Sequence, residues 1–343
     1  MFPLGRTKKS HSIRLYLLEA IKNGKPDYIQ NAVSSFGISR QAVHRHLLHL
    51  VNQNYLTAEG STRARKYSLG AHRWHQASYD LIDADEAVAY RESSFVFQGL
   101  PVGVEEICHY GFTEMFNNAI DHSEGKKIEV IAERNGNKIS ILIKDDGEGI
   151  FTRISRLLKL SDPRESLLEL GKGKLTTDPD NHTGEGIFFT SRVFDDYSIF
   201  SGDLAFHHID SMSHDFLMHD ANDRKGTAVL MEINTTSEKN LGEVFDEYSS
   251  GPDEYRFDKT VVPVRLALYE GERLVSRSQA KRIMNRVEKF KHVILDFEGV
   301  DSVGQAFADE VFRVYKNNHP NIELSHMNAN EQVNKMIRRA ESA

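Results

Sequence analysis

Residues 145–150 have the sequence Asp-Asp-Gly-Glu-Gly-Ile, and this stretch decides more of the fold than any other part of the chain. It follows two strand-like runs, 127–133 and 138–144, which are joined by the hairpin signal Asn135-Gly136. An acid followed by two spaced glycines lets a flat ring lie against bare backbone while the carboxylate accepts a hydrogen bond. The stretch therefore predicts a ligand-binding turn at the end of the second strand of a hairpin.

Two further segments on either side of this turn carry chemistry. In residues 114–123 the apolar side chains recur at helical spacing, which predicts a helix with one buried face. Glu114 and Asn118 are four residues apart and share a face of that helix, where a carboxylate can hold a water and an amide can complete a Mg²⁺ shell. Residues 182–189, His-Thr-Gly-Glu-Gly-Ile-Phe-Phe, place glycines before an apolar helix, whose N-terminal N–H groups favour phosphate.

Each pattern alone is common, because a turn with two glycines or a polar pair on a helix needs no ligand. In this order and spacing, over about residues 102–235, the three segments resemble the GHKL superfamily of ATPases, which includes histidine kinases, type II topoisomerases, mismatch-repair proteins and anti-sigma-factor kinases. The resemblance implies a Bergerat α/β sandwich, in which a mixed sheet is backed by helices. It also implies that the protein binds ATP and Mg²⁺.

The resemblance assigns roles to individual residues. Glu114 would be the general base or water-orienting group, Asn118 would bind Mg²⁺, and Asp145 would hydrogen-bond the adenine amino group. The other nucleotide-binding residues that it implies are glycines and hydroxyl groups around the base and the phosphates: Gly147, Gly149, Thr183, Gly184, Gly186 and Thr227.

An ATP lid would span residues 151–183 in this resemblance. It contains Lys172 and Lys174, each flanked by glycine, and we predict that one of these mobile cations reaches a phosphate. A solvated loop lysine is an equal alternative for both.

The composition of the 343-residue chain limits the remaining possibilities. This length allows two or three domains, and 39% hydrophobic with 27% charged residues is ordinary for a soluble globular protein. No run approaches the roughly 18 apolar residues needed to cross a bilayer. The single cysteine, Cys108, excludes an internal disulfide or a multi-cysteine zinc site. We therefore expect a cytoplasmic protein that does not bind membranes.

The charge is unevenly distributed. Residues 1–70 carry a net charge of +8, whereas the whole chain carries −7. This basic segment resembles a winged helix-turn-helix domain, whose known partner is DNA. It shows helical patterns at 12–23, 26–34 and 39–54, followed by a hairpin pattern at 55–69. The residues predicted to touch DNA are Ser39, Arg40, Gln41, His44 and Arg45 near the start of the third helix, and Arg63, Arg65 and Lys66 in the hairpin. The alternative is a fold of this kind that contacts only protein.

Residues 71–101 are harder to interpret. We treat them as a connector between domains, and a homodimer formed through this connector is one possibility. The expected domains are thus 1–70, 102–250 and 251–343. The last of these resembles a STAS-like domain, and the resemblance implies a protein partner. It rests on four expected elements: a buried strand at 292–297, a loop entering a helix at 301–312, a strand at 322–324 and a helix at 332–339.

Ser302 stands near the position that antagonists of this family present to a kinase, but Val303 takes the place directly before the glycine. We interpret Ser302 as a helix N-cap, with phosphorylation as the alternative. Three functions follow: an ATP-binding transcription regulator in which the GHKL module controls DNA binding, an anti-sigma-type protein serine kinase with a fused antagonist-like domain, or a scaffold that binds protein. The first is our leading hypothesis, and either slow Mg²⁺-dependent hydrolysis or kinase activity is compatible with it.

Overall fold

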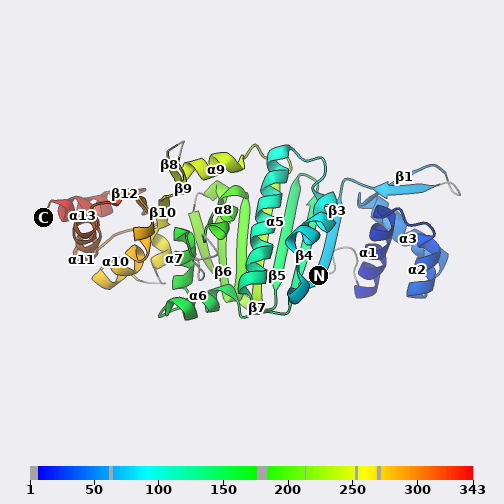
Figure 1. Ribbon diagram of the computed structural model, residues 1–343, viewed down its shortest axis with the longest axis horizontal. Coiled ribbons are helices and arrows are strands. Elements are labelled where there is room, and N and C mark those ends of the chain that lie inside the picture. The colour runs from blue at the N-terminus through cyan, green and yellow to red at the C-terminus, as the bar shows by residue number, and fades with distance from the viewer. Residues whose placement is uncertain are drawn as a thin grey trace.

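The protein's structure is a computed structural model that describes residues 7–61, 65–175, 184–212, 214–251, 254–268 and 272–342. Three units follow one another, and Figure 1 shows the N-terminal and C-terminal units at opposite ends of a central unit. All three combine helices with strands, so the predicted α/β multi-domain class is confirmed. Within the described residues, no helix has both the length and the apolar character needed to cross a membrane.

The N-terminal unit consists of three helices and a two-stranded antiparallel hairpin. Ser39 caps the third helix as predicted, because its hydroxyl accepts the backbone N–H of Ala42 at 3.2 Å. One apolar face of each helix points into a small core of its own that includes Leu17, Leu47 and Leu50. The elements are α1 (Lys8–Lys22), α2 (Tyr28–Phe36), α3 (Arg40–Asn52), β1 (Leu56–Glu59) and β2 (Lys66–Leu69).

The central unit is built on a five-stranded sheet in the order β3-β4-β5-β7-β6. Every pair of neighbours in this sheet is antiparallel, so the predicted mixed sheet is wrong for the described strands. For β4 and β5 the physical reason is the tight turn at 136–137, which reverses the chain direction. The strands are β3 (Arg73–Asp80), β4 (Lys127–Asn135), β5 (Lys138–Asp145), β6 (Asp196–Ile209) and β7 (His214–Asn234).

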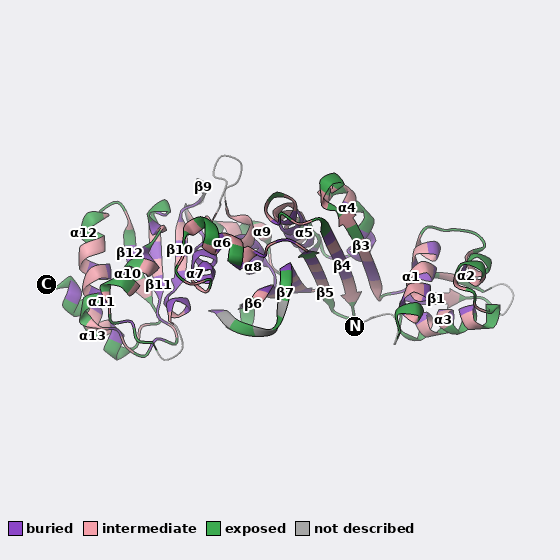
Figure 2. Ribbon diagram, turned by 90° about the horizontal axis from the view of Figure 1, so that it is seen from below, coloured by how far each residue is buried: buried purple, intermediate pink, exposed green. Residues whose placement is uncertain are grey.

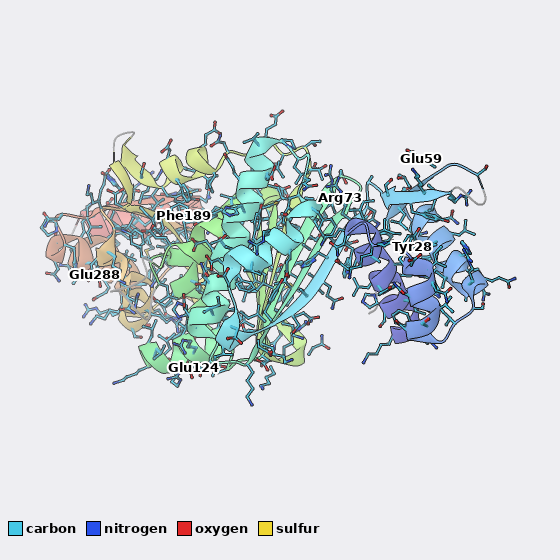
Figure 3. All side chains as sticks on the ribbon, turned by 45° about the vertical axis from the view of Figure 1, so that its right-hand side comes forward. Tyr28, Glu59, Arg73, Glu124, Phe189 and Glu288 are labelled. Carbon is cyan, nitrogen blue, oxygen red and sulfur yellow. The ribbon has the colours of Figure 1, made fainter. Side chains whose placement is uncertain are left out.

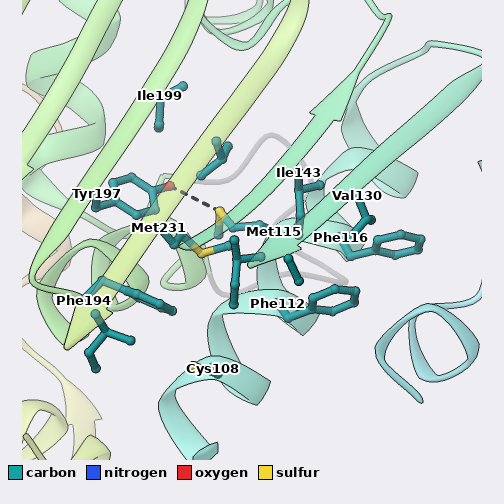
Figure 4. Close-up of a cluster of buried hydrophobic side chains, with 14 of the residues drawn as sticks. Cys108, Phe112, Met115, Phe116, Val130, Ile143, Phe194, Tyr197, Ile199 and Met231 are labelled. Atoms are coloured by element: carbon teal, nitrogen blue, oxygen red, sulfur yellow. Dashed lines mark hydrogen bonds between the residues drawn. The ribbon is translucent and has the colours of Figure 1, made fainter. Parts of the chain in front are cut away.

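Helices cover one face of this sheet, as the two views in Figures 1 and 2 show. The strand pattern explains which face is covered, because Ile128, Val130 and Ala132 alternate along β4 and are all fully buried. Phe112 and Phe116 of the longest helix stack with ring centroids 5.7 Å apart above these strands (Figure 4). The helices of this unit are α4 (Glu86–Ser93), α5 (Val102–His122), α6 (Ile150–Leu158), α7 (Glu165–Lys172), α8 (Gly186–Val193) and α9 (Leu241–Glu247).

Residues 71–101 do not form the separate connector that we predicted. They supply the edge strand β3, which pairs with β4 along its whole length, and α4, which packs on α5. The strand lacks the expected alternation because Trp74 and His75 are adjacent and both buried. Trp74 belongs to the core of the N-terminal unit, whereas the His75 ring lies 6.2 Å from the ring of Phe95.

The N-terminal unit is attached to this edge by several contacts (Figure 3 labels Arg73 at this junction). The ring of His72 stacks on Tyr55 at 3.7 Å, and its Nε2 lies 2.6 Å from a carboxylate oxygen of Glu133. On the other side of the junction, the Lys22 ammonium lies 4.0 Å from the centre of the Phe95 ring. The unit predicted to bind DNA is therefore packed against the central sheet.

The C-terminal unit contains three parallel strands in the order β10-β11-β12, with helices between them. The predicted strands at 292–297 and 322–324 and the closing helix are present, and β10 is an additional strand that the sequence pattern did not indicate. The elements are β8 (Ser249–Gly251), β9 (Glu254–Phe257), β10 (Lys259–Pro263), α10 (Arg277–Met284), β11 (His292–Asp296), α11 (Gln305–Asp309), α12 (Lys316–Asn318), β12 (Glu323–Met327) and α13 (Glu331–Glu341).

The N-cap interpretation of Ser302 is wrong. Helix α11 begins at Gln305, its N-cap is Gly304, and no side chain caps it. The loop before this helix is instead held by the backbone, because Gly304 donates its N–H to the carbonyl of Leu274 at 2.7 Å. Ser302 is half-buried in that loop.

Candidate functional site

A cavity of about 140 Å³ opens between the C-terminal half of α5, the end of β5 and helices α6, α7 and α8. It brings together residues from three segments that are far apart in the sequence and that we singled out before. The predicted residues that line it are Glu114, Asn118, Asp145, Gly149, Gly184, Gly186 and Thr227.

Asp145 ends β5 and is held at its place by the backbone. Its Oδ1 accepts the N–H of Gly147 at 2.8 Å and the N–H of Thr227 at 3.2 Å. The residue is only 6% exposed, and burial raises the pKa of its carboxyl although these two hydrogen bonds act to lower it. Asp145 lines the cavity, so its carboxylate can offer an acceptor to a ligand there.

The turn after Asp145 depends on glycine. Gly149 has φ +90°, which side chains rarely adopt, and a Cβ there would lie 2.4 Å from the hydroxyl oxygen of Ser201. Directly after it, Ile150 begins α6 and donates its N–H to the hydroxyl of Thr227 at 3.0 Å. The turn and β7 are thereby joined at one end of the cavity. Gly147 does not line the cavity itself and acts as a backbone donor to Asp145.

Glu114 and Asn118 face the cavity from α5, as the four-residue spacing predicts. Helix α8 begins directly against the carboxylate of Glu114, because a Cβ on Gly186 would lie 2.0 Å from Glu114 Oε2. The amide nitrogen of Asn118 is 4.0 Å from the sulfur of Met115, a weak contact. The acid, the amide and the first turn of α8 therefore meet at the same end of the cavity.

Sequence reasoning missed the apolar walls and one cation. The walls include Met115, Ile143 and Ile199, which Figure 4 labels within one buried cluster. Arg153 also lines the cavity from α6, and its guanidinium pairs with Glu124 and Glu148 at the mouth. Arg153 stands four residues after Gly149, inside the stretch that we predicted as a lid, and no pattern in the sequence singled it out.

Of the two lysines of which we predicted that one reaches a phosphate, Lys172 is not among the residues that line the cavity. The lysine ends α7, is 1% exposed, and donates to Glu169 Oε1 at 2.7 Å and to the carbonyl of Asn285 at 2.8 Å. The Lys174 ammonium bonds the carbonyl of Lys289 at 3.2 Å and lies 4.9 Å from the Phe290 ring. Both lysines face the C-terminal unit, because the predicted lid is helical here and packs against β10. Thr183 lies outside the described residues.

The side chains around the cavity can be compared with those that the predicted Mg²⁺ site requires. Among the described residues, no three His, Cys, Asp or Glu side chains are grouped so that they can hold an ion. Mg²⁺ typically takes one or two oxygen ligands from the protein and the rest from phosphates and water. The single amide of Asn118 beside Glu114 fits that mode of binding and does not fit a metal held by protein alone.

The residues predicted to bind DNA lie on the surface of the N-terminal unit. Ser39, Arg40, Gln41, His44 and Arg45 are all exposed on the first turns of α3, and Arg65 and Lys66 are exposed in the hairpin. Arg63 lies outside the described residues. The described residues that we predicted to touch DNA are therefore all at the surface.

Comparison with known proteins identifies one part of the chain. Residues 279–334, from α10 into α13, match a family model described as a STAS-like domain of unknown function (DUF4325). The C-terminal unit is STAS-like. No curated protein matches the sequence. The predicted STAS-like domain is thereby confirmed over the matched residues, and we call the C-terminal unit the STAS-like unit from here on.

Replacing Asp145 by asparagine tests whether the buried charge of this carboxylate lowers the stability of the folded protein. Because the pKa of Asp145 is raised in the folded state, its contribution to stability is complete below the unfolded pKa of about 4 and is lost as the pH rises through the folded value. Asp145→Asn keeps the acceptor for both backbone N–H groups, so we expect its melting temperature at pH 7 to equal or exceed that of the parent. Thermal denaturation at pH 7 and pH 4 measures this.

The expected advantage of the variant should shrink at pH 4, where the parent carboxyl takes up a proton. A variant that melts several degrees below the parent at pH 7 would show instead that the charge itself holds the turn together.

Proposed function

We propose that the protein is an ATP-binding regulator of transcription, in which a GHKL module of the Bergerat fold controls DNA binding by a winged helix-turn-helix. One observation carries the nucleotide part of this proposal. Glu114, Asp145 and Gly186 are separated by more than thirty positions from one to the next, yet they line a single cavity. Their order in the sequence and their meeting in space both agree with the superfamily that the sequence resembles.

The end of the cavity near Asp145 suits a purine base. Its carboxylate offers an acceptor to an exocyclic amino group, and Ile143, Ile154 and Val229 supply apolar surface for the faces of a flat ring. The hydroxyl of Thr227 stabilises the turn through Ile150. Adenine carries such an amino donor where guanine carries a carbonyl oxygen, so an acceptor at this position favours ATP over GTP.

The opposite end suits phosphates. The N-terminal turn of α8, with Gly184 and Gly186 before and within it, directs backbone N–H groups and the positive end of the helix dipole toward the cavity. Asn118 would hold Mg²⁺ together with the phosphates, and the ion would supply neutralisation of their charge. Glu114, which lies against Gly186, is the carboxylate that can orient a water and accept its proton.

The first prediction from this proposal concerns binding of the nucleotide. In Asp145→Asn, the amide oxygen must keep its bonds to Gly147 and Thr227, so the amide N–H₂ faces the amino group of adenine. Loss of a hydrogen bond to a charged acceptor costs about 1.5–3 kcal/mol. We expect an increase of at least roughly tenfold in the dissociation constant for Mg·ATP, measured by titration calorimetry.

Asp146→Asn is the matched control, because the neighbouring acid bonds the backbone of Lys126 and Lys127 outside the cavity. Equal affinities for the parent and both variants would remove Asp145 from the nucleotide site.

The second prediction separates binding from turnover. Glu114→Gln keeps the shape of the side chain against Gly186 but cannot accept a proton, so we expect nearly unchanged affinity for ATP and a loss of about 10²–10⁴-fold in phosphate release. Phosphate release under steady-state conditions and calorimetry on the same samples measure the two quantities.

Mass spectrometry of the parent after incubation with Mg·ATP adds a further outcome. A phosphate attached to the chain, with little free phosphate, would favour the alternative of a protein serine kinase. A Glu114→Gln variant that releases phosphate as fast as the parent would exclude Glu114 as the base.

The third prediction concerns DNA. Arg45 is exposed on α3 of the basic N-terminal unit, and side chains at the start of such a helix reach base edges in the major groove. We expect Arg45→Ala to weaken binding to genomic fragments by about 1–3 kcal/mol in a gel shift at moderate salt. The gel shift is run with and without Mg·ATP, which we expect to change the affinity of the parent.

Arg338→Ala, which removes an exposed cation from α13, is the control for the loss of one positive charge. Failure of the parent to shift any fragment, at either nucleotide condition, would favour a unit that contacts only protein.

A further inference from the structure

Two helices that line the cavity also belong to the core of the STAS-like unit. Leu170 of α7 faces the cavity, while Leu168 of the same helix packs in the STAS-like core. In α8, Ile187 lines the cavity, and the next two residues, Phe188 and Phe189, have their ring centroids within 4.8 Å of the ring of Phe257. Figure 1 shows α7 between the central sheet and the STAS-like strands. One wall of the cavity is therefore shared by both units.

A buried polar cluster fixes α7 to the STAS-like unit. Lys172 at the end of α7 donates to the carbonyl of Asn285, directly after α10, and pairs with Glu169 one turn earlier. Arg286 of the STAS-like unit completes the cluster, with its Nε 3.5 Å from Glu169 Oε2. Buried charges of this kind are strongly destabilising when one partner is removed, so α7 and the STAS-like unit hold each other in one arrangement.

Arg286 also reaches the chain that leads from α7 back to the cavity. Its Nη2 donates to the carbonyl of Lys174 at 3.4 Å, and Leu175, the next residue, lines the cavity. The backbone of Leu175 is packed closely against Gly184, because a Cβ on that glycine would lie 2.5 Å from the Leu175 carbonyl carbon. The guanidinium of Arg286 thus bonds the residue that directly precedes Leu175 of the cavity wall.

The same contact holds strained backbone. Lys174 has φ +50° and Arg286 has φ +63°, and both are non-glycine residues in the left-handed region. Such backbone is strained for residues other than glycine and persists only where the surroundings impose it. The carbonyl of Lys174 accepts hydrogen bonds from Arg286 and from the ammonium of Lys289 at 3.2 Å, so two cations of the STAS-like unit hold this segment.

We propose that the STAS-like unit completes the nucleotide site: Arg286 is a positioning residue that holds the Leu170–Leu175 wall through Glu169 and Lys174. This inference rests on the proposed nucleotide function and adds its regulation. Because coupling between two sites is reciprocal, a partner that binds the STAS-like unit and displaces Arg286 changes the affinity for nucleotide, and nucleotide changes the STAS-like unit by the same free energy.

The experiment uses the full chain with Arg286→Asn, because asparagine tolerates the left-handed backbone but removes the guanidinium. Arg277→Ala is the matched control, since Arg277 lies on α10 and pairs with two acids of the STAS-like unit, Asp309 and Glu310. Arg286→Lys, which keeps a cation for Glu169, is the conservative variant and should restore part of the effect.

Hydrogen exchange is measured first without nucleotide. We expect faster exchange in residues 168–175 of Arg286→Asn than in the parent or Arg277→Ala, with little change in the central strands β4 and β5. Mg·ATP is then added. We expect about tenfold weaker binding to Arg286→Asn, and protection of residues 284–289 by nucleotide in the parent but not in this variant.

Each outcome distinguishes the two proposals. If the parent binds no ATP, the nucleotide function fails, and the exchange of residues 168–175 without nucleotide still decides whether Arg286 holds the wall. If the parent binds ATP, and Arg286→Asn matches Arg277→Ala in exchange and in affinity, the positioning role of Arg286 is overturned while the nucleotide function stands.

Discussion

The buried carboxylate of Asp145 is the constraint on which the cavity depends. It stands at the end of β5, and its Oδ1 is bonded to the backbone of the following turn and to the backbone of β7. These two bonds join segments that lie eighty positions apart in the sequence. Burying a carboxylate is unfavourable, and burial raises the pKa of Asp145. Its burial here therefore agrees with the proposed role, in which the carboxylate accepts a hydrogen bond from a ligand.

The opposite side of the cavity is held by a different kind of interaction. Helix α8 is anchored at its far end by Arg192, which forms a bidentate pair with Asp215 of β7. Burial alone would raise the pKa of Asp215, but Arg192 and His208 hold it well below its usual range. Together with the Lys172 cluster on α7, this pair restrains both helices that the central and STAS-like units share. The α8 end of the cavity, which we propose for the phosphates, is therefore also the end that touches the STAS-like unit.

Local patterns predicted the residues of the cavity better than the course of the chain around it. The four-residue spacing of Glu114 and Asn118 and the glycine turn after Asp145 depend only on neighbours in sequence. The edge strand β3 was missed because its two adjacent buried residues, Trp74 and His75, pack against different partners. The N-cap interpretation of Ser302 failed for a related reason, since the loop is held by a backbone bond from Gly304 to Leu274, a residue distant in sequence.

The sequence by itself determined the elements that rest on short-range rules: the turn glycines, the polar face of α5, the cap at Ser39 and the concentration of positive charge in the first seventy residues. Only the tertiary structure decided where Lys172, at the end of α7, points. Flanking glycines suggest a mobile loop, but burial between two units gives Lys172 three oxygen partners and leaves it 1% exposed. The physical reason is that the environment of a charged side chain is set by whatever packs over it, and the residues that cover Lys172 lie more than a hundred positions further along the chain.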